Sequence, residues 1–182
     1  MKNLKLLTLI VISILTSAFV VCKVLDWKVK DDYVVKFKFG KYTFGVDSMP
    51  SPNHGTIKGL HATIHFDPND LEKSHVSISV EAKTIETGEP LKNASATGPD
   101  VLIAPKFPLI SFKSTSLAKT DFGYEAVGNI TIKDISKEIR FPFTFKNETF
   151  DGGFTLETKD FKFTHPHVPK EISVFFTIPV TQ

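Results

Sequence analysis

The sequence predicts an all-β fold, an antiparallel β-barrel of about eight strands with one or two short helical turns. Three observations predict it: apolar and polar residues alternate along eight segments, turn-forming residues separate these segments, and no segment after residue 22 keeps a helical period. Successive side chains of a strand point to opposite faces of a sheet, so each segment has one apolar and one polar face. A closed barrel is favoured over a sandwich because closure removes exposed sheet edges.

Residues 1–22 have the composition and order of an export signal. Lys2 and Lys5 precede an apolar run that includes Thr16-Ser17-Ala18, small residues typical of a cleavage site. An uncleaved membrane anchor is the alternative, since the run approaches the roughly 20 residues that a spanning helix needs. Both interpretations place residues 23–182 outside the cytoplasm, in the periplasm or the extracellular space.

Cys22 is the single cysteine of the chain, so residues 23–182 form no internal disulfide and depend on their core for stability. It stands where a bacterial lipoprotein carries its lipidated cysteine, but Val20-Val21 precede it in place of a small residue. A cleaved signal is therefore favoured, and a form lipid-anchored at Cys22 is the alternative.

The composition of residues 23–182 restricts their function. Without Lys2 and Lys5, the basic residues equal the 20 acidic residues in number. A nucleic-acid-binding protein shows a basic excess or stripe, which this segment lacks, so no nucleic-acid partner is expected. The length suits one domain with a sizeable core, and no repeat or linker divides it.

The eight alternating segments follow one another with short spacers. In the clearest one, Leu60, Ala62, Ile64 and Phe66 share one parity. The pattern ends at Asp67-Pro68, because proline cannot donate to a sheet and its fixed φ suits a turn or the first position of a helix. We therefore expect at most one helical turn after Asp67. The predicted strands are residues 33–39, 55–66, 75–84, 109–117, 124–132, 137–145, 150–157 and 172–180.

Phenylalanine is unusually frequent, with 17 Phe against 3 Tyr and 1 Trp. Several share a parity with other apolar residues, as Phe141 and Phe143 do with Ile139. An eight-stranded barrel is either just filled by such side chains or holds one small ligand. Because apolar pockets and apolar cores are lined by the same residue types, both interpretations stay open at this point.

The sequence lacks the motifs of the common enzyme classes. It contains no Gly-x-Ser-x-Gly, no His-Glu-x-x-His and no glycine-rich phosphate loop. His61 and His65 lie on a strand, where four residues span about 13 Å, so they cannot share a metal ion. His165 and His167 have no third ligand nearby in the sequence. No catalytic residue, metal site or cofactor is predicted.

Four motifs occur along the chain in a characteristic order. They are Phe66-Asp67-Pro68, a Thr-Ile-x-Thr-Gly segment at 84–88, a Pro-x-Ile-x-Phe-x-Ser-Thr strand at 108–115, and a hairpin from Gly128 to Lys137. In this order they resemble the YceI-like family of bacterial exported proteins. The resemblance covers the chain from about Trp27 to its end.

The resemblance implies a lipocalin-like barrel over residues 23–182 that holds a long isoprenoid chain, such as a polyisoprenoid or an isoprenoid quinone. Sequestering a hydrocarbon requires no catalysis. Residues 89–106 depart from the family's pattern, so no role is transferred to them. Membrane association through residues 1–22 and a homodimer remain open. The alternative function is a ligand-free barrel that binds another envelope protein through its outer face.

If the barrel holds a lipid, the residues on the more apolar face of each strand, near its middle, should contact the lipid. The choice of face is more secure for Phe143 than for Phe176, whose neighbour Phe175 is equally apolar. The ten predicted ligand-binding residues are Leu60, Ile64, Ile78, Val80, Ile110, Phe112, Ile130, Phe141, Phe143 and Phe176.

Overall fold

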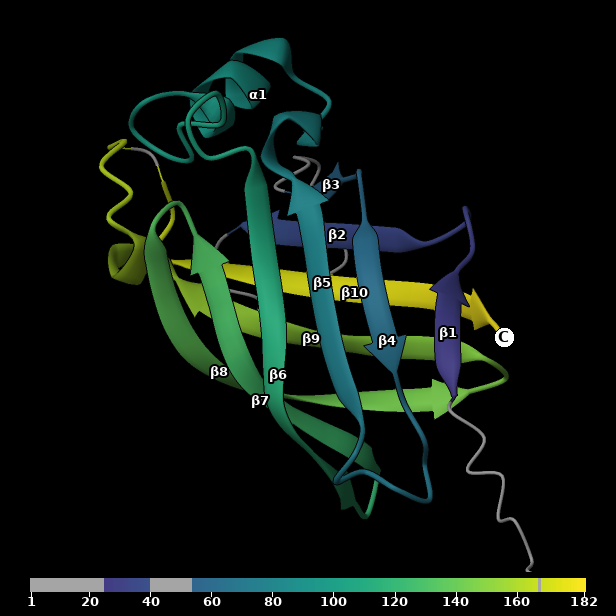
Figure 1. Ribbon diagram of the computed structural model, residues 1–182. Helices are drawn as coiled ribbons and strands as arrows, with labels where there is room; N and C mark the ends of the chain where they lie inside the picture. The colour runs from purple at the N-terminus through teal and green to yellow at the C-terminus, as the bar shows by residue number, and fades with distance from the viewer. Residues whose placement is uncertain (1–24, 40–53, 167) are drawn as a thin grey trace, which may run out of the picture.

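The computed structural model describes residues 25–39, 54–166 and 168–182, which form a closed antiparallel barrel of eight strands with an added hairpin (Figure 1). The barrel consists of β1 and β4 to β10, and the hairpin of β2 and β3. The predicted fold class is confirmed. The elements are β1 (Asp26–Val29), β2 (Val34–Phe39), β3 (His54–Ile57), β4 (His61–His65), β5 (His75–Glu81), η1 (Ala82–Thr84), α1 (Pro90–Thr97), β6 (Leu109–Thr120), β7 (Gly123–Ile132), β8 (Ile135–Lys146), β9 (Thr149–Glu157), η2 (Thr158–Phe161) and β10 (Glu171–Thr181).

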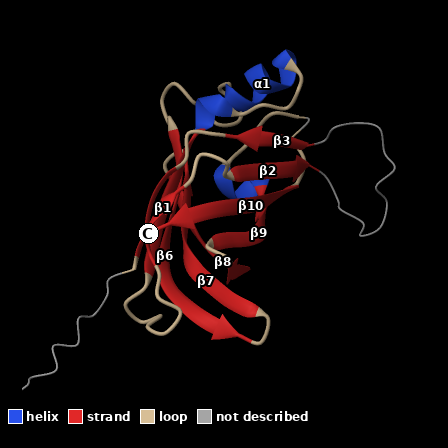
Figure 2. Cartoon of the chain, turned by 90° about the vertical axis from the view of Figure 1, so that its right-hand side faces the viewer, coloured by secondary structure: helices blue, strands red, loops and turns tan. Residues whose placement is uncertain are grey.

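Strand β1 closes the barrel because it pairs with a strand on each side. Trp27 lies opposite Ile64 of β4, and Val29 lies opposite Val180 of β10. The β2–β3 hairpin continues along the same edge of β10, where Phe37 lies opposite Val174. Figure 2 shows this hairpin at the same end of the barrel as α1. Strand β10 therefore joins the closed ring to the hairpin.

The segment predicted as one strand at residues 55–66 is two strands, so this prediction was wrong. Gly59 separates them, because its φ of +69° is a left-handed conformation that other residues rarely adopt. A Cβ at this position would also lie 2.5 Å from Cγ of Glu81. The bend directs β3 to β2 and leaves β4 to pair with β5.

Two elements appear where the sequence predicted none. Strand β1 has four residues, too few for an alternation to be recognised. Helix α1 has eight residues and none of them is buried, so its sequence carries no apolar stripe from which a helix could be predicted. Both elements contribute to closing the barrel, β1 along its side and α1 at one end (Figure 1).

The end of the barrel opposite α1 is where β4 ends and β7 begins (Figure 1). Aromatic side chains fill this end. Phe66 is completely buried at the centre of this cluster, and its carbonyl accepts a hydrogen bond of 2.9 Å from Trp27 Nε1. We call this cluster the aromatic floor. It consists of Trp27, Phe66, Tyr124, Phe143, Phe145 and Phe150.

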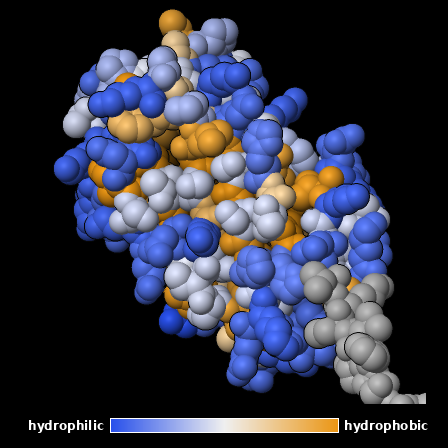
Figure 3. All heavy atoms as spheres, in the orientation of Figure 1, coloured by the Kyte–Doolittle hydropathy of each residue, from blue (hydrophilic) through white to orange (hydrophobic). Residues whose placement is uncertain are grey.

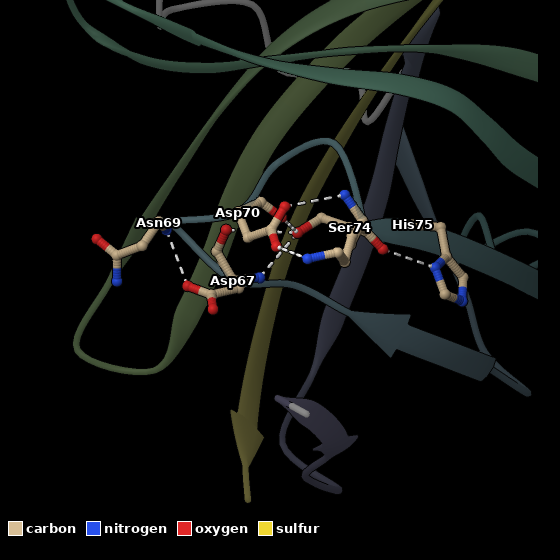
Figure 4. A network of polar contacts seen from close by, with 6 residues as sticks. Asp67, Asn69, Asp70, Ser74 and His75 are labelled. Atoms are coloured by element: carbon tan, nitrogen blue, oxygen red, sulfur yellow. Dashed lines mark hydrogen bonds and ion pairs between the residues drawn. The ribbon is translucent and has the colours of Figure 1, made fainter. Parts of the chain in front are cut away.

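The corner after β4 is a series of hydrogen-bonded turns without a helix (Figure 4). Asp67 accepts a hydrogen bond of 2.8 Å from the Asn69 amide at its Oδ1, and its own amide donates to Ser74 Oγ at 2.8 Å. The Ser74 hydroxyl donates to the carbonyl of Asp70 at 2.9 Å. The Asp67 side chain thus caps a free amide of the turn, and the one helical turn allowed by the sequence does not form.

Replacing Asp67 by alanine should lower the free energy of unfolding by about 1 kcal/mol, because the Asn69 amide loses its acceptor. Urea unfolding of the two proteins measures this change, and Asn69→Ala, at an exposed position of the same turn, is the control. If Asp67→Ala kept the parent's stability and lost a bound lipid, the corner would have a binding role that we do not expect.

Candidate functional site

The barrel encloses an apolar cavity of about 230 Å³ between the aromatic floor and the residues beneath α1. For comparison, an engineered protein cavity of about 150 Å³ binds benzene. Ligand pockets for drug-sized molecules usually reach about 300–1,000 Å³. The space is therefore larger than that engineered cavity and smaller than the usual pocket for a drug-sized molecule.

All ten residues predicted to bind a ligand line this cavity, so the predicted inward parity is correct for each of them. Their contact with a ligand remains a prediction. Phe176 points inward while Phe175 is 42% exposed on the outer face, which resolves the one choice that alternation left open. The buried members are Ile64, Ile130, Phe141 and Phe143, and the half-buried members are Leu60, Ile78, Val80, Ile110, Phe112 and Phe176.

The half-buried members show where the barrel is not packed solid. They face the interior, yet their side chains retain accessible surface because the cavity leaves it uncovered. Ile78 is an example, whereas Ile64 on the neighbouring strand is only 3% exposed. In a fully packed interior these inward side chains would all be covered.

Glycines on the inner wall make room for two of the aromatic rings. A Cβ at Gly152 would lie 2.6 Å from Cζ of Phe176, and a Cβ at Gly128 would lie 2.6 Å from Cζ of Phe112. Each ring therefore lies directly over the backbone of a glycine, an arrangement known to stabilise strand glycines. Rings that lie against the wall occupy less of the space at the centre of the barrel.

Residues 89–106, which we call the cap, cover the end of the barrel opposite the aromatic floor (Figures 1 and 2). They comprise α1 and a loop in which Val101, Leu102 and Ala104 are buried. Val101, Leu102 and Ala96 line the cavity. The segment to which the sequence assigned no role is thus the roof of the cavity.

Hydrogen bonds hold the cap near both of its ends. Asn93 Oδ1 accepts from the amide of Thr87 at 2.8 Å and from its hydroxyl at 2.7 Å. The side-chain Nδ2 of Asn93 also donates to the Glu86 carboxylate at 3.0 Å, and this bond holds the pKa of Glu86 below its usual value. Towards the other end, the Thr164 amide donates to the carbonyl of Asp100 at 2.8 Å.

Other residues of the lining were also missed by the sequence analysis. Val35 and Phe37 line the cavity and lie two positions apart in a predicted strand, so the alternation of that strand could have indicated that they share the inner face. Phe161 is the last residue of the short helix η2, and Phe163 lies in the loop that follows, so no alternation indicates which way their side chains face. Their positions depend on how the chain folds back beneath the cap.

Among the residues that the structure describes, the lining contains no charged side chain, and its polar members are Ser111 and Thr158. The Thr158 hydroxyl already donates to the carbonyl of Pro169 at 2.6 Å. A lining of this composition offers no acid, base or nucleophile to a bound molecule apart from hydroxyl groups. It can enclose a hydrocarbon and provides no hydrogen-bonding set for a polar head group.

His61 and His65 lie on the outer face of the barrel, whereas His165 lies in the loop between η2 and β10. His61 Nε2 is 3.8 Å from a Glu81 carboxylate oxygen, and His65 Nδ1 is 3.1 Å from Asp26 Oδ1. The ring of His65 stacks on that of His75. Within the described ranges, no three His, Cys, Asp or Glu side chains are placed to hold a metal ion. His167 lies outside the described residues.

No helix in the described part of the chain is both long and apolar enough to cross a membrane. Residues 1–22, on which the predictions of an export signal, an anchor and a lipidated Cys22 depend, lie outside the described residues.

The chain is similar to known proteins in sequence and in fold. The family model described as the YceI-like domain matches residues 27–180. Protein YceI of Salmonella arizonae is 23% identical over 137 residues, which cover 70% of this chain and 72% of that protein. BcnA of Burkholderia cenocepacia superposes with a TM-score of 0.74 at 21% identity, covering 85% of this chain and all of that one. A polyisoprenoid binding domain from Saccharophagus degradans, implicated in plant cell wall breakdown, gives a TM-score of 0.58 at 8% identity and covers 84% of this chain and 95% of that domain. The structural similarities establish a shared fold.

Proposed function

The chain belongs to the YceI-like domain family, and from this premise we propose that it binds an isoprenoid lipid in the barrel cavity and carries or sequesters it outside the cytoplasm. In this proposal the protein is a binding protein, without a catalytic step. The ligand is a polyisoprenoid or an isoprenoid quinone whose chain enters the cavity.

One observation carries the proposal: the cavity of about 230 Å³ is lined almost entirely by aliphatic and aromatic side chains. Transfer of a hydrocarbon from water into such a space is worth about 0.8 kcal/mol per methylene. A polar ligand would lose its hydrogen bonds to water without replacing them, at a cost of about 1–3 kcal/mol per group. The cavity therefore selects an apolar chain.

The similarity to a polyisoprenoid binding domain supports the choice of an isoprenoid over other lipids. The apolar lining agrees with it, because a prenyl chain is a flexible hydrocarbon. A head group, such as a quinone ring, is expected to remain outside the cavity, since the described part of the lining gives it no polar partners beyond two hydroxyl-bearing residues.

Organic extraction of the purified protein followed by mass spectrometry tests this function. We expect an isoprenoid to co-purify in an amount comparable to that of the protein. A second measurement uses retinol, a fluorescent isoprenoid alcohol, whose emission should rise on entry into the cavity. Protein that carries no lipid and leaves retinol emission unchanged would favour the alternative, a ligand-free barrel that binds another envelope protein.

The proposed location rests on the order of charges, apolar run and small residues in residues 1–22. We expect the protein in the envelope or extracellular fraction, with its N-terminus removed at or before Cys22. Intact-mass measurement of the recovered protein distinguishes cleavage, lipid addition at Cys22 and retention of the whole segment. Full-length chain in the cytoplasm would contradict export.

A further inference from the structure

We propose that the capped end of the barrel docks on a lipid bilayer through Leu91, so that the membrane lies directly over the roof of the cavity. This inference rests on the proposed function, because it takes the membrane to be the source of the isoprenoid lipid. Figure 3 shows hydrophobic side chains at the surface of this end of the molecule, among hydrophilic ones.

Leu91 is held away from the body of the protein by the helix that carries it. Its side chain is 84% exposed, and no residue of α1 is buried. A single exposed leucine requires no explanation by itself. At the same end of the barrel, however, Leu109 is 45% exposed and Lys106 Nζ lies 5.0 Å from the centre of the Phe107 ring. Apolar side chains with a cation beside them suit the boundary between lipid head groups and acyl chains.

The exposed leucine and the roof of the cavity belong to one continuous segment. Leu91 and Ala96 lie on the same short helix, and Ala96 lines the cavity. Val101 and Leu102, in the loop that follows, line it as well. Among the described residues, it is therefore the cap that would separate a bilayer in contact with Leu91 from the cavity, and this is a short path for an apolar chain that must avoid water.

The charges of residues 89–109, the segment that carries Leu91 and Leu109, favour an apolar contact over an electrostatic one. Between residues 89 and 109 the acidic residues Glu89 and Asp100 balance the basic residues Lys92 and Lys106. Lys92 is already paired with Glu89, at 2.7 Å. A surface without net charge gains little from anionic lipid, so its attraction to a bilayer should persist at high salt.

Tryptophan placed at position 91 reports docking directly. The full chain carrying Leu91→Trp is mixed with vesicles of phosphatidylcholine whose acyl chains are brominated, which quench indole emission on contact. Phe122→Trp is the matched control, because Phe122 is 92% exposed in the turn between β6 and β7, at the opposite end of the barrel (Figure 1). The native Trp27 is 8% exposed within the aromatic floor, so it supplies a constant background.

We expect quenching of the Leu91→Trp emission, at low and at high salt, and little change for Phe122→Trp. Equal quenching of both variants would indicate attachment through another part of the chain and would overturn the proposal. So would absence of quenching for Leu91→Trp, or a concentration-dependent shift of its emission without vesicles, which would indicate contact with a second copy of the chain.

A second pair of variants separates docking from lipid binding. Leu91→Asp should slow the uptake of retinol from phosphatidylcholine vesicles by about tenfold or more, because burial of a leucine side chain contributes at least that factor. It should bind retinol added from ethanol as the parent does, and Phe122→Asp should match the parent in both measurements. Unchanged uptake by Leu91→Asp would refute docking through this residue. Failure of the parent to bind retinol from ethanol would refute the proposed function instead, and the quenching measurement would still decide the docking.

Discussion

The Ile78→Trp variant is expected to fold as the parent does and to lose most of its bound isoprenoid. Ile78 is half-buried and faces the cavity, and its neighbour across the β4–β5 pair is the small residue Ala62. The indole can therefore extend into the space of about 230 Å³ without displacing the wall. The indole would occupy space that a bound chain needs. Overfilling a packed core costs about 1–3 kcal/mol, and a cost of this size would lower lipid retention about ten- to hundredfold.

Lipid retention is measured by extraction and mass spectrometry, and stability by urea unfolding of protein refolded without lipid, so that bound ligand does not contribute to it. The control is Ile64→Trp, the same substitution on the neighbouring strand at a position that is 3% exposed. Ile64 also lines the cavity, but its side chain is covered by the core cluster that contains Trp27 and Phe66. The larger side chain should overfill this packing and cost about 1–3 kcal/mol. Equal destabilisation by the two substitutions would mean that the interior is solid at both positions and would contradict the cavity as a binding site.

The Phe66→Ala variant is expected to show the largest loss of stability in the domain, about 3–5 kcal/mol. The ring of Phe66 is fully buried, and its centre lies 5.1 Å from that of Tyr124 and 5.2 Å from that of Phe150. Removal of the ring takes away these edge-to-face contacts and leaves a void where the rigid sheet cannot close around it. For a domain of this size, such a loss is a large part of the total stability.

Urea unfolding followed by the fluorescence of Trp27, the single tryptophan of the chain, measures this loss. Trp27 is a useful reporter because its Nε1 donates to the carbonyl of Phe66 at 2.9 Å. Phe122→Ala is the control, since that side chain is 92% exposed and its removal should change the stability by no more than about 0.5 kcal/mol. A loss of less than about 1.5 kcal/mol for Phe66→Ala would show that the aromatic floor adapts easily, as a mobile ligand pocket would.

The aromatic floor and the part of the barrel wall between the floor and the cap have different roles in the proposed function. The floor supplies the packing that a domain without a disulfide needs, because Phe66, Phe143 and Phe150 are buried. The wall above it can then leave side chains such as Ile78 and Val80 partly uncovered. Stability and binding are thus expected to respond to different substitutions.

Much of the barrel could be predicted from the sequence, because alternation is a local property of a strand. The side chains of Ile64, Phe141 and Phe143 face the interior as their parity requires, and the same holds for the other seven predicted lining residues. The absence of a helical period and the four ordered motifs indicated the fold class and the family. The signal interpreted in residues 1–22 is equally local and remains a prediction.

Only the tertiary structure decided the remaining features, because each depends on contacts between residues far apart in the chain. The alternating segment is divided at Gly59 because β3 pairs with β2, whereas β4 pairs with β5. Phe176 and Phe175 have equal hydrophobicity, so only the pairing of β10 determines which of them lies inside. The cap has no periodicity that would place it over the barrel. Whether apolar side chains form a solid core or enclose a cavity depends on the volume they fill together, and hydrophobic pattern in a sequence carries no measure of that volume.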